Sequence, residues 1–166
     1  MSGPGPDGLA WQQVEVEADG LARAVQARFA AHPHHVLATL HADGRPRVSG
    51  TNVLFGDGCL WVGSMPGARK AADLRRDPRC ALHSAPLDEE LPDAAGDARV
   101  EAVAVPLDDA TAAHLLDLEY GDGPRPDGGE FFELRVTALS LVTVEGDELR
   151  VRSWSPGAGS GETLRR

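Results

Sequence analysis

The sequence is poor in cysteine and lacks any long hydrophobic run. Cys59 and Cys80 are its two cysteines among 166 residues, and each lies inside an apolar segment. The count allows one disulfide, but two reduced core thiols are the expected state in a cytoplasmic protein. No stretch approaches the roughly 18 consecutive apolar residues of a membrane span. Residues 1–8 show neither the basic nor the apolar part of a secretory signal, so we expect a cytoplasmic protein without a membrane partner.

Basic residues are outnumbered, with 16 lysines and arginines against 26 acids and a formal net charge of −10. Nucleic-acid binding depends on neutralising phosphates, so this balance argues against a nucleic-acid partner. Residues 69–79 are an exception, because they hold five basic residues and two acids. A local positive segment in an acidic protein favours a small anionic ligand over a polymer.

The length and composition fit one globular domain. Hydrophobic residues make up 42% of the chain and charged residues 25%, which is ordinary for a folded domain of this size. We expect a flexible lead over residues 1–10, a domain over residues 11–154 and a tail over residues 155–166, where glycine and serine are frequent.

Short β-segments dominate the predicted elements. Helical apolar spacing predicts a helix over residues 14–31 that Pro33 ends, a second helix of about ten residues after Pro66-Gly67, and a third over residues 108–120. Short apolar or alternating segments between turn residues predict strands over 35–41, 47–55, 59–64, 80–84, 98–105, 131–144 and 148–154, and an acidic loop over 86–96. Antiparallel strands with a few short helices indicate a closed or partly open barrel.

Three features between Arg47 and Lys70 point to a bound phosphate. Alternation along a strand places Arg47, Ser49 and Thr51 on one polar face. Ser64 ends the strand before the second helix, and Arg69 and Lys70 lie in that helix's first turn. Free N–H groups and a partial positive charge at this end favour an anion, whereas cations there are unfavourable unless an anion lies nearby.

These segments resemble the flavin-binding split-barrel family, which includes pyridoxamine phosphate oxidases and deazaflavin-dependent reductases. The resemblance covers residues 35–86 and, more loosely, residues 131–154. It implies a mainly β fold, a split barrel of antiparallel strands with a few short helices. It also implies that Arg69 and Lys70 bind the cofactor phosphate and that Trp154 closes over a flavin from the partner subunit. The implied cofactor-binding set is Arg47, Val48, Ser49, Gly50, Thr51, Asn52, Gly63, Ser64, Arg69, Lys70 and Trp154.

By the same resemblance, we expect an FMN-binding oxidoreductase that acts on a small molecule as a homodimer. A deazaflavin-dependent reductase and a non-catalytic flavin- or haem-binding module are the alternatives. We assign no catalytic residue, because the flavin itself carries out the electron chemistry. His32, His34 and His35 cluster beside Pro33, but their spacing matches no metal-ligand pattern, so we predict no metal site.

The sequence departs from the family pattern at three places. Asn52 stands where pyridoxamine phosphate oxidases tend to have a lysine, and Asp73 stands where many relatives have a neutral amide. The last residues also lack the arginine-containing substrate motif of those oxidases. We therefore expect no pyridoxamine phosphate oxidase activity at a physiological rate.

Overall fold

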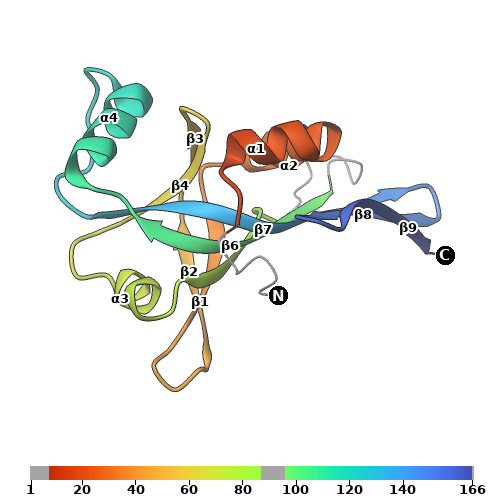
Figure 1. Cartoon of the computed structure of the whole chain (residues 1–166), viewed down its shortest axis with the longest axis horizontal. Helices are drawn as coiled ribbons and strands as arrows, with labels where there is room; N and C mark the ends of the chain where they lie inside the picture. The colour runs from red at the N-terminus through yellow and green to blue at the C-terminus, as the bar shows by residue number, and fades with distance from the viewer. Residues whose placement is uncertain (1–7, 87–95, 166) are drawn as a thin grey trace.

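The computed structural model describes residues 8–86 and 96–165 (Figure 1). Four helices occur in these ranges: α1 (Trp11–Glu17), α2 (Asp19–Ala30), α3 (Arg69–Arg76) and α4 (Asp109–Tyr120). The strands are β1 (His35–Leu40), β2 (Pro46–Thr51), β3 (Val53–Gly56), β4 (Cys59–Ser64), β5 (Arg79–His83), β6 (Asp97–Pro106), β7 (Glu130–Glu145), β8 (Glu148–Ser155) and β9 (Gly159–Arg165). No helix within the described ranges combines the length and apolar character required to cross a bilayer.

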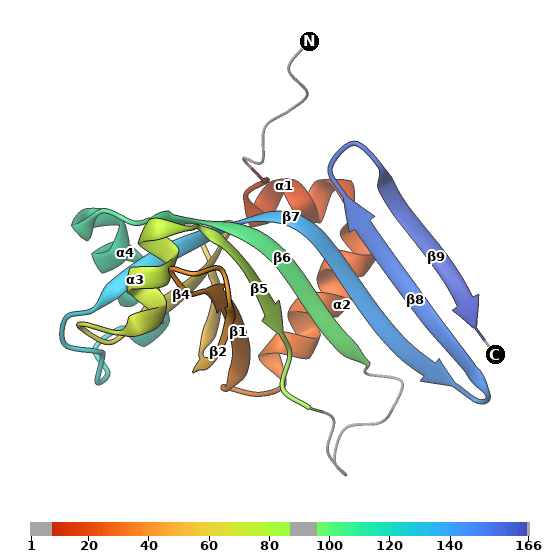
Figure 2. The same ribbon diagram turned by 90° about the horizontal axis from the view of Figure 1, so that it is seen from below.

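All strands join one antiparallel sheet, in the order β2-β1-β5-β6-β7-β4-β3, with β8 and β9 added beyond β7. The long strand β7 makes this arrangement possible. Its first residues pair with β4, its later residues pair with β8, and β6 runs along its other side. The β8–β9 hairpin consequently extends away from the curled part of the sheet (Figure 2). β2 and β3 lie at the two ends of the strand order and follow each other through Asn52 alone, so one bent strand links the two ends of the curled sheet.

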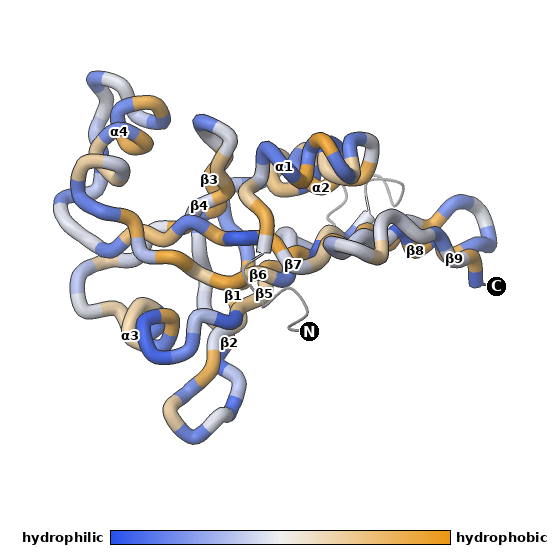
Figure 3. Tube along the Cα trace, viewed as in Figure 1, coloured by the Kyte–Doolittle hydropathy of each residue, from blue (hydrophilic) through white to orange (hydrophobic). Residues whose placement is uncertain are grey.

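The main hydrophobic core lies inside the curled sheet and under the first two helices. Leu60 and Val62 of β4 point into this core, together with Val25 and Phe29 of α2, and all four are almost fully buried. Helices α1 and α2 alternate between hydrophilic and hydrophobic residues, as expected for helices with one buried face (Figure 3). Trp61 is buried on the opposite face of β4 and lies outside this cluster.

The predicted strands and the helix over residues 108–120 are confirmed, including the Asp108 cap, whose carboxylate accepts a hydrogen bond from the Thr111 N–H at 2.8 Å. Two predicted elements are each divided in two. The helix predicted over residues 14–31 is broken at Ala18, whose ψ of 32° is not helical. The strand predicted over residues 47–55 is broken at Asn52, because the segment before it pairs with β1 and the segment after it pairs with β4.

The segment expected to be a tail, residues 155–166, contains a strand that the sequence analysis did not predict. Residues Gly159–Arg165 form β9, which pairs along β8 from Leu149 to Ser155. The open edge of β8 supplies backbone partners for a sequence whose glycines and serines have low intrinsic strand preference. The predicted acidic loop over residues 86–96 lies largely outside the described residues.

Candidate functional site

A cleft of about 590 Å³ opens beside the end of β2 and the start of α3. Strands β2, β3, β4 and β7 supply one side, and α4 with the segment after it supplies the other. Six residues predicted for the site line this cleft: Gly50, Thr51, Asn52, Gly63, Ser64 and Lys70. The structure thus brings together the ends of two strands and the start of a helix, as the spacing of these residues predicts.

The alternation predicted along β2 is present. Arg47, Ser49 and Thr51 are the more buried residues, whereas Val48 and Gly50 face outward, with Val48 70% exposed. Thr51 and the outward-facing Gly50 reach the cleft, but Arg47, Val48 and Ser49 do not line it. The cleft therefore meets the end of β2 and not its whole polar face.

Arg47 instead forms a charged cluster around Asp73 of α3. Its Nε donates to Asp73 Oδ2 at 2.5 Å, Thr39 Oγ1 donates to the same oxygen at 2.9 Å, and Arg76 Nη2 donates to Oδ1 at 2.9 Å. Burial alone would raise the pKa of Asp73, but the hydrogen bonds from Arg47, Arg76 and Thr39 outweigh it and lower the pKa to about 2. Two guanidinium groups thus offset the charge of this acid, which lies in the phosphate-binding helix predicted from the sequence.

The end of β4 contributes Gly63 and Ser64. A Cβ atom at Gly63 would lie 2.9 Å from Cε1 of Phe131, so glycine is required for this ring to lie against the strand. Ser64 is 6% exposed, and its buried Oγ has no hydrogen-bond partner among the described residues. A buried hydroxyl without a partner is uncommon and calls for an explanation such as a ligand or a bound water.

Helix α3 begins beside Ser64 after a turn at Gly67, which has a φ of +72°. Ala68 occupies the N-cap position and its side chain forms no capping hydrogen bond, so Arg69 and Lys70 are the first two helical residues. The ammonium of Lys70 donates to the carbonyl oxygen of Gly50 at 2.9 Å, and burial lowers the pKa of Lys70. Arg69 is exposed and forms no hydrogen bond or ion pair with any described residue.

The other basic residues of segment 69–79 are already paired. Arg75 forms an ion pair with Glu130, Arg76 with Asp73 and Arg79 with Asp77. Within the described part of the chain, Arg69 and Lys70 are therefore the cations of this segment that lack an acidic partner. Both lie at the end of α3 where the helix dipole is positive.

Sequence reasoning missed the opposite wall of the cleft. Leu116 and Tyr120 of α4 and the Pro126–Gly128 segment lie there, and Leu54, Trp61 and Phe131 supply apolar surface from the strands. His34 also lines the cleft, and its Nδ1 lies 3.0 Å from Oδ1 of Asn52. The spacing of α4 predicts a helix, but no local signal shows that it faces β3 and β4.

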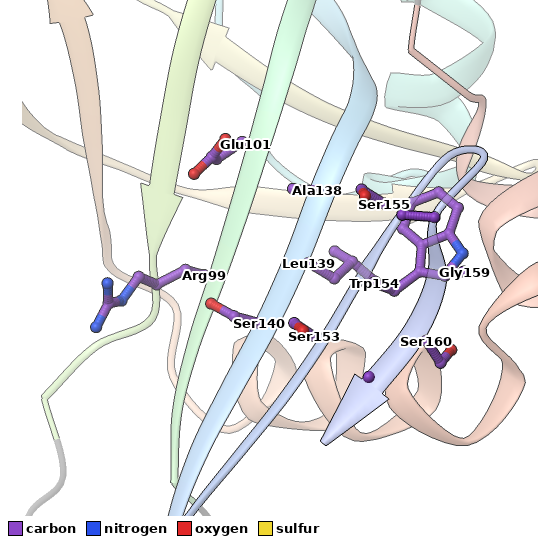
Figure 4. Close-up of a pocket in the computed structure, with 12 residues that line it drawn as sticks. Arg99, Glu101, Ala138, Leu139, Ser140, Ser153, Trp154, Ser155, Gly159 and Ser160 are labelled. Atoms are coloured by element: carbon purple, nitrogen blue, oxygen red, sulfur yellow. The ribbon is translucent and has the colours of Figure 1, made fainter. Parts of the chain in front are cut away.

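Trp154 lies elsewhere. It is 2% exposed, pairs across β7–β8 with Leu139 and lines a separate pocket of about 390 Å³ with Arg99, Ser140 and residues of β9 (Figure 4). Its Nε1 has no hydrogen-bond partner among the described residues. Trp154 does not line the cleft of its own chain, and its predicted role in the cleft of a partner subunit stays a prediction.

The curled antiparallel sheet, whose two ends are joined by the bend between β2 and β3, defines a split-barrel protein. The sequence profile of the pyridoxamine 5'-phosphate oxidase family matches residues 21–143, and the chain belongs to this family. No curated protein matches the sequence.

Solved structures share the fold at low sequence identity. PhzG from Burkholderia lata 383, solved with tetrahydrophenazine-1-carboxylic acid, superposes with a TM-score of 0.63 at 17% identity and covers 100% of this chain and 98% of its own. The haem storage protein HutZ from Vibrio cholerae has a TM-score of 0.55 at 20% identity, covering 70% and 89%. An F420 reductase has a TM-score of 0.50 at 22% identity, covering 66% and 90%. The same fold thus occurs in a reductase and in a haem storage protein.

Proposed function

We propose that the chain binds FMN in the cleft and acts as a flavin-dependent oxidoreductase on a small molecule. The observation that carries this proposal is the Ser64 hydroxyl, which is buried, has no partner within residues 8–86 and 96–165, and is adjacent to the uncapped start of α3. A phosphate at this position would accept hydrogen bonds from Ser64 and from the free N–H groups of the helix. Arg69 and Lys70 would supply charge-assisted hydrogen bonds to the same group.

The distribution of charge favours FMN over a deazaflavin. FMN ends at a phosphate monoester with close to two negative charges, which Arg69 and Lys70 can balance. The deazaflavin cofactor continues beyond its phosphate into further carboxylates, which would need additional cations. Lys70 is the one lysine or arginine among the described residues that line the cleft, Asp127 adds a carboxylate, and Arg69 precedes Lys70 on α3 without lining it. A deazaflavin-dependent reductase therefore remains the alternative with less support.

FMN, when bound, supplies the hydride and electron chemistry, and the protein supplies binding and orientation. The side chains of Leu54, Trp61 and Phe131 give the cleft an apolar wall that would exclude water from a flat ring. Lys70 would exchange its hydrogen bond with the Gly50 carbonyl for one with the phosphate, or share its protons between them. None of the described residues is assigned a catalytic role.

Non-catalytic haem binding is a second candidate because of one residue. His34 lines the cleft and is exposed, and neutral imidazole is a common iron ligand. The hydrogen bond of Nδ1 to Asn52 leaves Nε2 available for iron, and Arg69 and Lys70 could pair with the haem propionates. FMN is preferred because a phosphate would supply a partner for the buried Ser64 hydroxyl, which has none among the described residues. Haem binding that disappears in His34→Ala and survives in Lys70→Ala would establish this candidate over the first.

The test compares FMN with riboflavin, because the two ligands differ only in the phosphate. We expect FMN to bind at least ten-fold more tightly by fluorescence titration, and F420 and haem to bind more weakly than FMN. Lys70 is the sole lysine of the sequence, so lysine labelled with ¹³C gives a single side-chain NMR signal from this residue. FMN should shift that signal and riboflavin should not. Equal affinities for FMN and riboflavin would contradict the phosphate site. If FMN binds more tightly, reduction of the bound FMN by a nicotinamide donor tests whether the protein turns over.

We also propose a homodimer, because the cleft is open at the surface and the family resemblance implies a flavin held between two subunits. Light scattering at micromolar concentration should then report about twice the chain mass of 17.5 kDa. A monomer that retains FMN would contradict this part of the proposal.

A further inference from the structure

A second cavity of about 600 Å³ lies between α2 and α4, along the outer edge of β3. In Figure 1 these two helices flank β3 on opposite sides. The cavity shares Asn52, Leu54 and Tyr120 with the candidate FMN cleft but is otherwise lined by different residues. It is therefore a neighbouring site and not a part of that cleft.

Backbone hydrogen-bond acceptors converge on this cavity. Helix α2 ends at Ala30 and helix α4 ends at Tyr120, and both residues line it. The last carbonyl groups of a helix have no partner within the helix and carry a partial negative charge. The carbonyl oxygen of Tyr120 already accepts a hydrogen bond from the Gly123 N–H at 2.8 Å, and that of His32 lies 2.8 Å from Nε2 of His35. Each carbonyl oxygen has two lone pairs, so it can accept a second hydrogen bond from a ligand. β3 is the terminal strand of the sheet order, so its outer edge presents further carbonyl groups without a neighbouring strand.

No cation of the lining offsets this negative potential. The last turn of α4 contains no basic residue. The last turn of α2 contains Arg28, but its guanidinium is buried and donates to the carbonyl oxygens of Ala85 and Gly96. Among the described lining residues, Glu119 adds a carboxylate and His32 is the other titratable group besides Tyr120. Glu119 is exposed and forms no hydrogen bond or ion pair with a described residue.

The remaining surface of the cavity is apolar or aromatic. Phe55, Leu54 and Tyr120 are half-buried and line it, whereas Phe29 is 1% exposed and belongs to the hydrophobic core against which Phe55 packs. Aromatic faces attract cations, and apolar side chains favour a ligand with a hydrophobic body. Acceptors, negative potential and aromatic surface therefore coincide in one cavity.

We propose that this cavity binds a hydrophobic primary ammonium compound. The ammonium group would donate up to three hydrogen bonds to the helix-end and β3 carbonyls, and the Glu119 carboxylate would add a second negative partner. The apolar body would lie against Phe55, Leu54 and Tyr120. This proposal does not depend on which cofactor occupies the neighbouring cleft.

The test uses ¹H–¹⁵N NMR titrations of the full chain at pH 7 with 2-phenylethylammonium, and with neutral 2-phenylethanol for comparison. We expect the ammonium compound to shift the signals of Ala30, Leu54 and Glu119 and to bind several-fold more tightly than the alcohol. Equal binding of the two compounds, or shifts confined to other parts of the molecule, would overturn the proposal.

Glu119→Gln and Glu101→Gln provide a matched pair, because both residues are exposed acids but Glu101 lies on β6 and does not line this cavity. Glu119→Gln should weaken binding of the ammonium compound by up to about five-fold and leave binding of the alcohol unchanged. Ala31→Trp places a large side chain at an exposed lining position and should abolish binding of both compounds. Identical ammonium affinities in the two glutamine variants, or full binding to Ala31→Trp, would contradict the proposed position of the ligand.

Discussion

The cleft beside α3 and the pocket around Trp154 each contain a buried polar atom without a partner among the described residues, but their surroundings differ. Ser64 lies next to an uncapped helix start and two cations without acidic partners. Trp154 belongs to the main hydrophobic core and lies opposite Leu139. The same local feature therefore indicates a ligand in one place and a tightly packed core residue in the other. Neighbouring charges and free backbone groups decide between the two interpretations.

The largest effect should come from Trp154→Ala. Removing a fully buried indole from the core should lower the free energy of unfolding by about 3–5 kcal/mol, measured by urea denaturation. The folded fraction should bind FMN as the parent does if Trp154 acts only as a core residue, because it does not line the cleft of its own chain. Trp154→Phe keeps most of the packing and removes the unpartnered N–H, so it should cost much less. Weaker FMN binding by Trp154→Phe would show that Trp154 contributes to the FMN site.

Asp73→Asn should have the next largest effect, about 3 kcal/mol of unfolding free energy, because it leaves two guanidinium groups without their buried carboxylate. The pH dependence follows from the pKa of Asp73, which is about 2 in the folded protein against an ordinary value of 3.8. The ionised carboxylate stabilises the fold above about pH 4, and this contribution is lost as the pH falls from there towards 2. Urea denaturation between pH 5 and 2 should therefore show a steeper loss for the parent than for the variant. Parallel curves would show that the cluster contributes nothing measurable.

Lys70→Ala should weaken FMN binding by about ten- to a hundred-fold, through loss of a charge-assisted hydrogen bond to the phosphate. Riboflavin binding should not change. Arg79→Ala is the matched control, since Arg79 is an exposed cation of the same segment that is paired with Asp77. Added salt should weaken FMN binding to the parent more than to Lys70→Ala.

The unfolding free energy of Lys70→Ala without ligand should change little, because the lost hydrogen bond to Gly50 and the removed charge at the helix start have opposite effects. Similar FMN affinities in the two alanine variants would contradict the assignment of Lys70.

The smallest effect is expected for Ser64→Ala. One neutral hydrogen bond to the phosphate is worth about 0.5–1.5 kcal/mol, so FMN affinity should fall by roughly two- to ten-fold. The protein without ligand should be as stable as the parent or slightly more stable, because the variant removes a buried hydroxyl that has no partner among the described residues. A clear loss of stability without ligand would show that the hydroxyl has a structural role.

Much of the fold could be predicted because its signals are local. Turn residues between short apolar segments locate the strands, and the cap at Asp108 locates α4. The break at Asn52 could not be predicted, since it depends on a change of partner from β1 to β4. β9 was missed for the same reason: the edge of β8, and not its own composition, makes it a strand.

The site was predicted only in part, because some of its residues are brought together by the tertiary fold and not by local sequence signals. Gly63, Ser64 and Lys70 lie within one short segment whose spacing indicates a strand followed by a helix, and all three line the cleft. Arg47 was predicted for the site because it lies on the polar face of β2, but it does not line the cleft. It binds Asp73, which is 26 residues away in the sequence, and sequence spacing does not reveal such a pair. Tyr120 reaches the cleft from a helix whose position depends on the tertiary fold.

The cluster of Arg47, Arg76 and Asp73 also affects how this protein can diverge. Each arginine depends on the same carboxylate, so a neutral residue at position 73 leaves two positive charges next to each other on β2 and α3. Substitutions at these three positions are therefore expected to be inherited together. A descendant that loses Asp73 and keeps Arg47 would have a guanidinium free to turn towards a new ligand, so a single change at a structural acid could open a route to a different specificity.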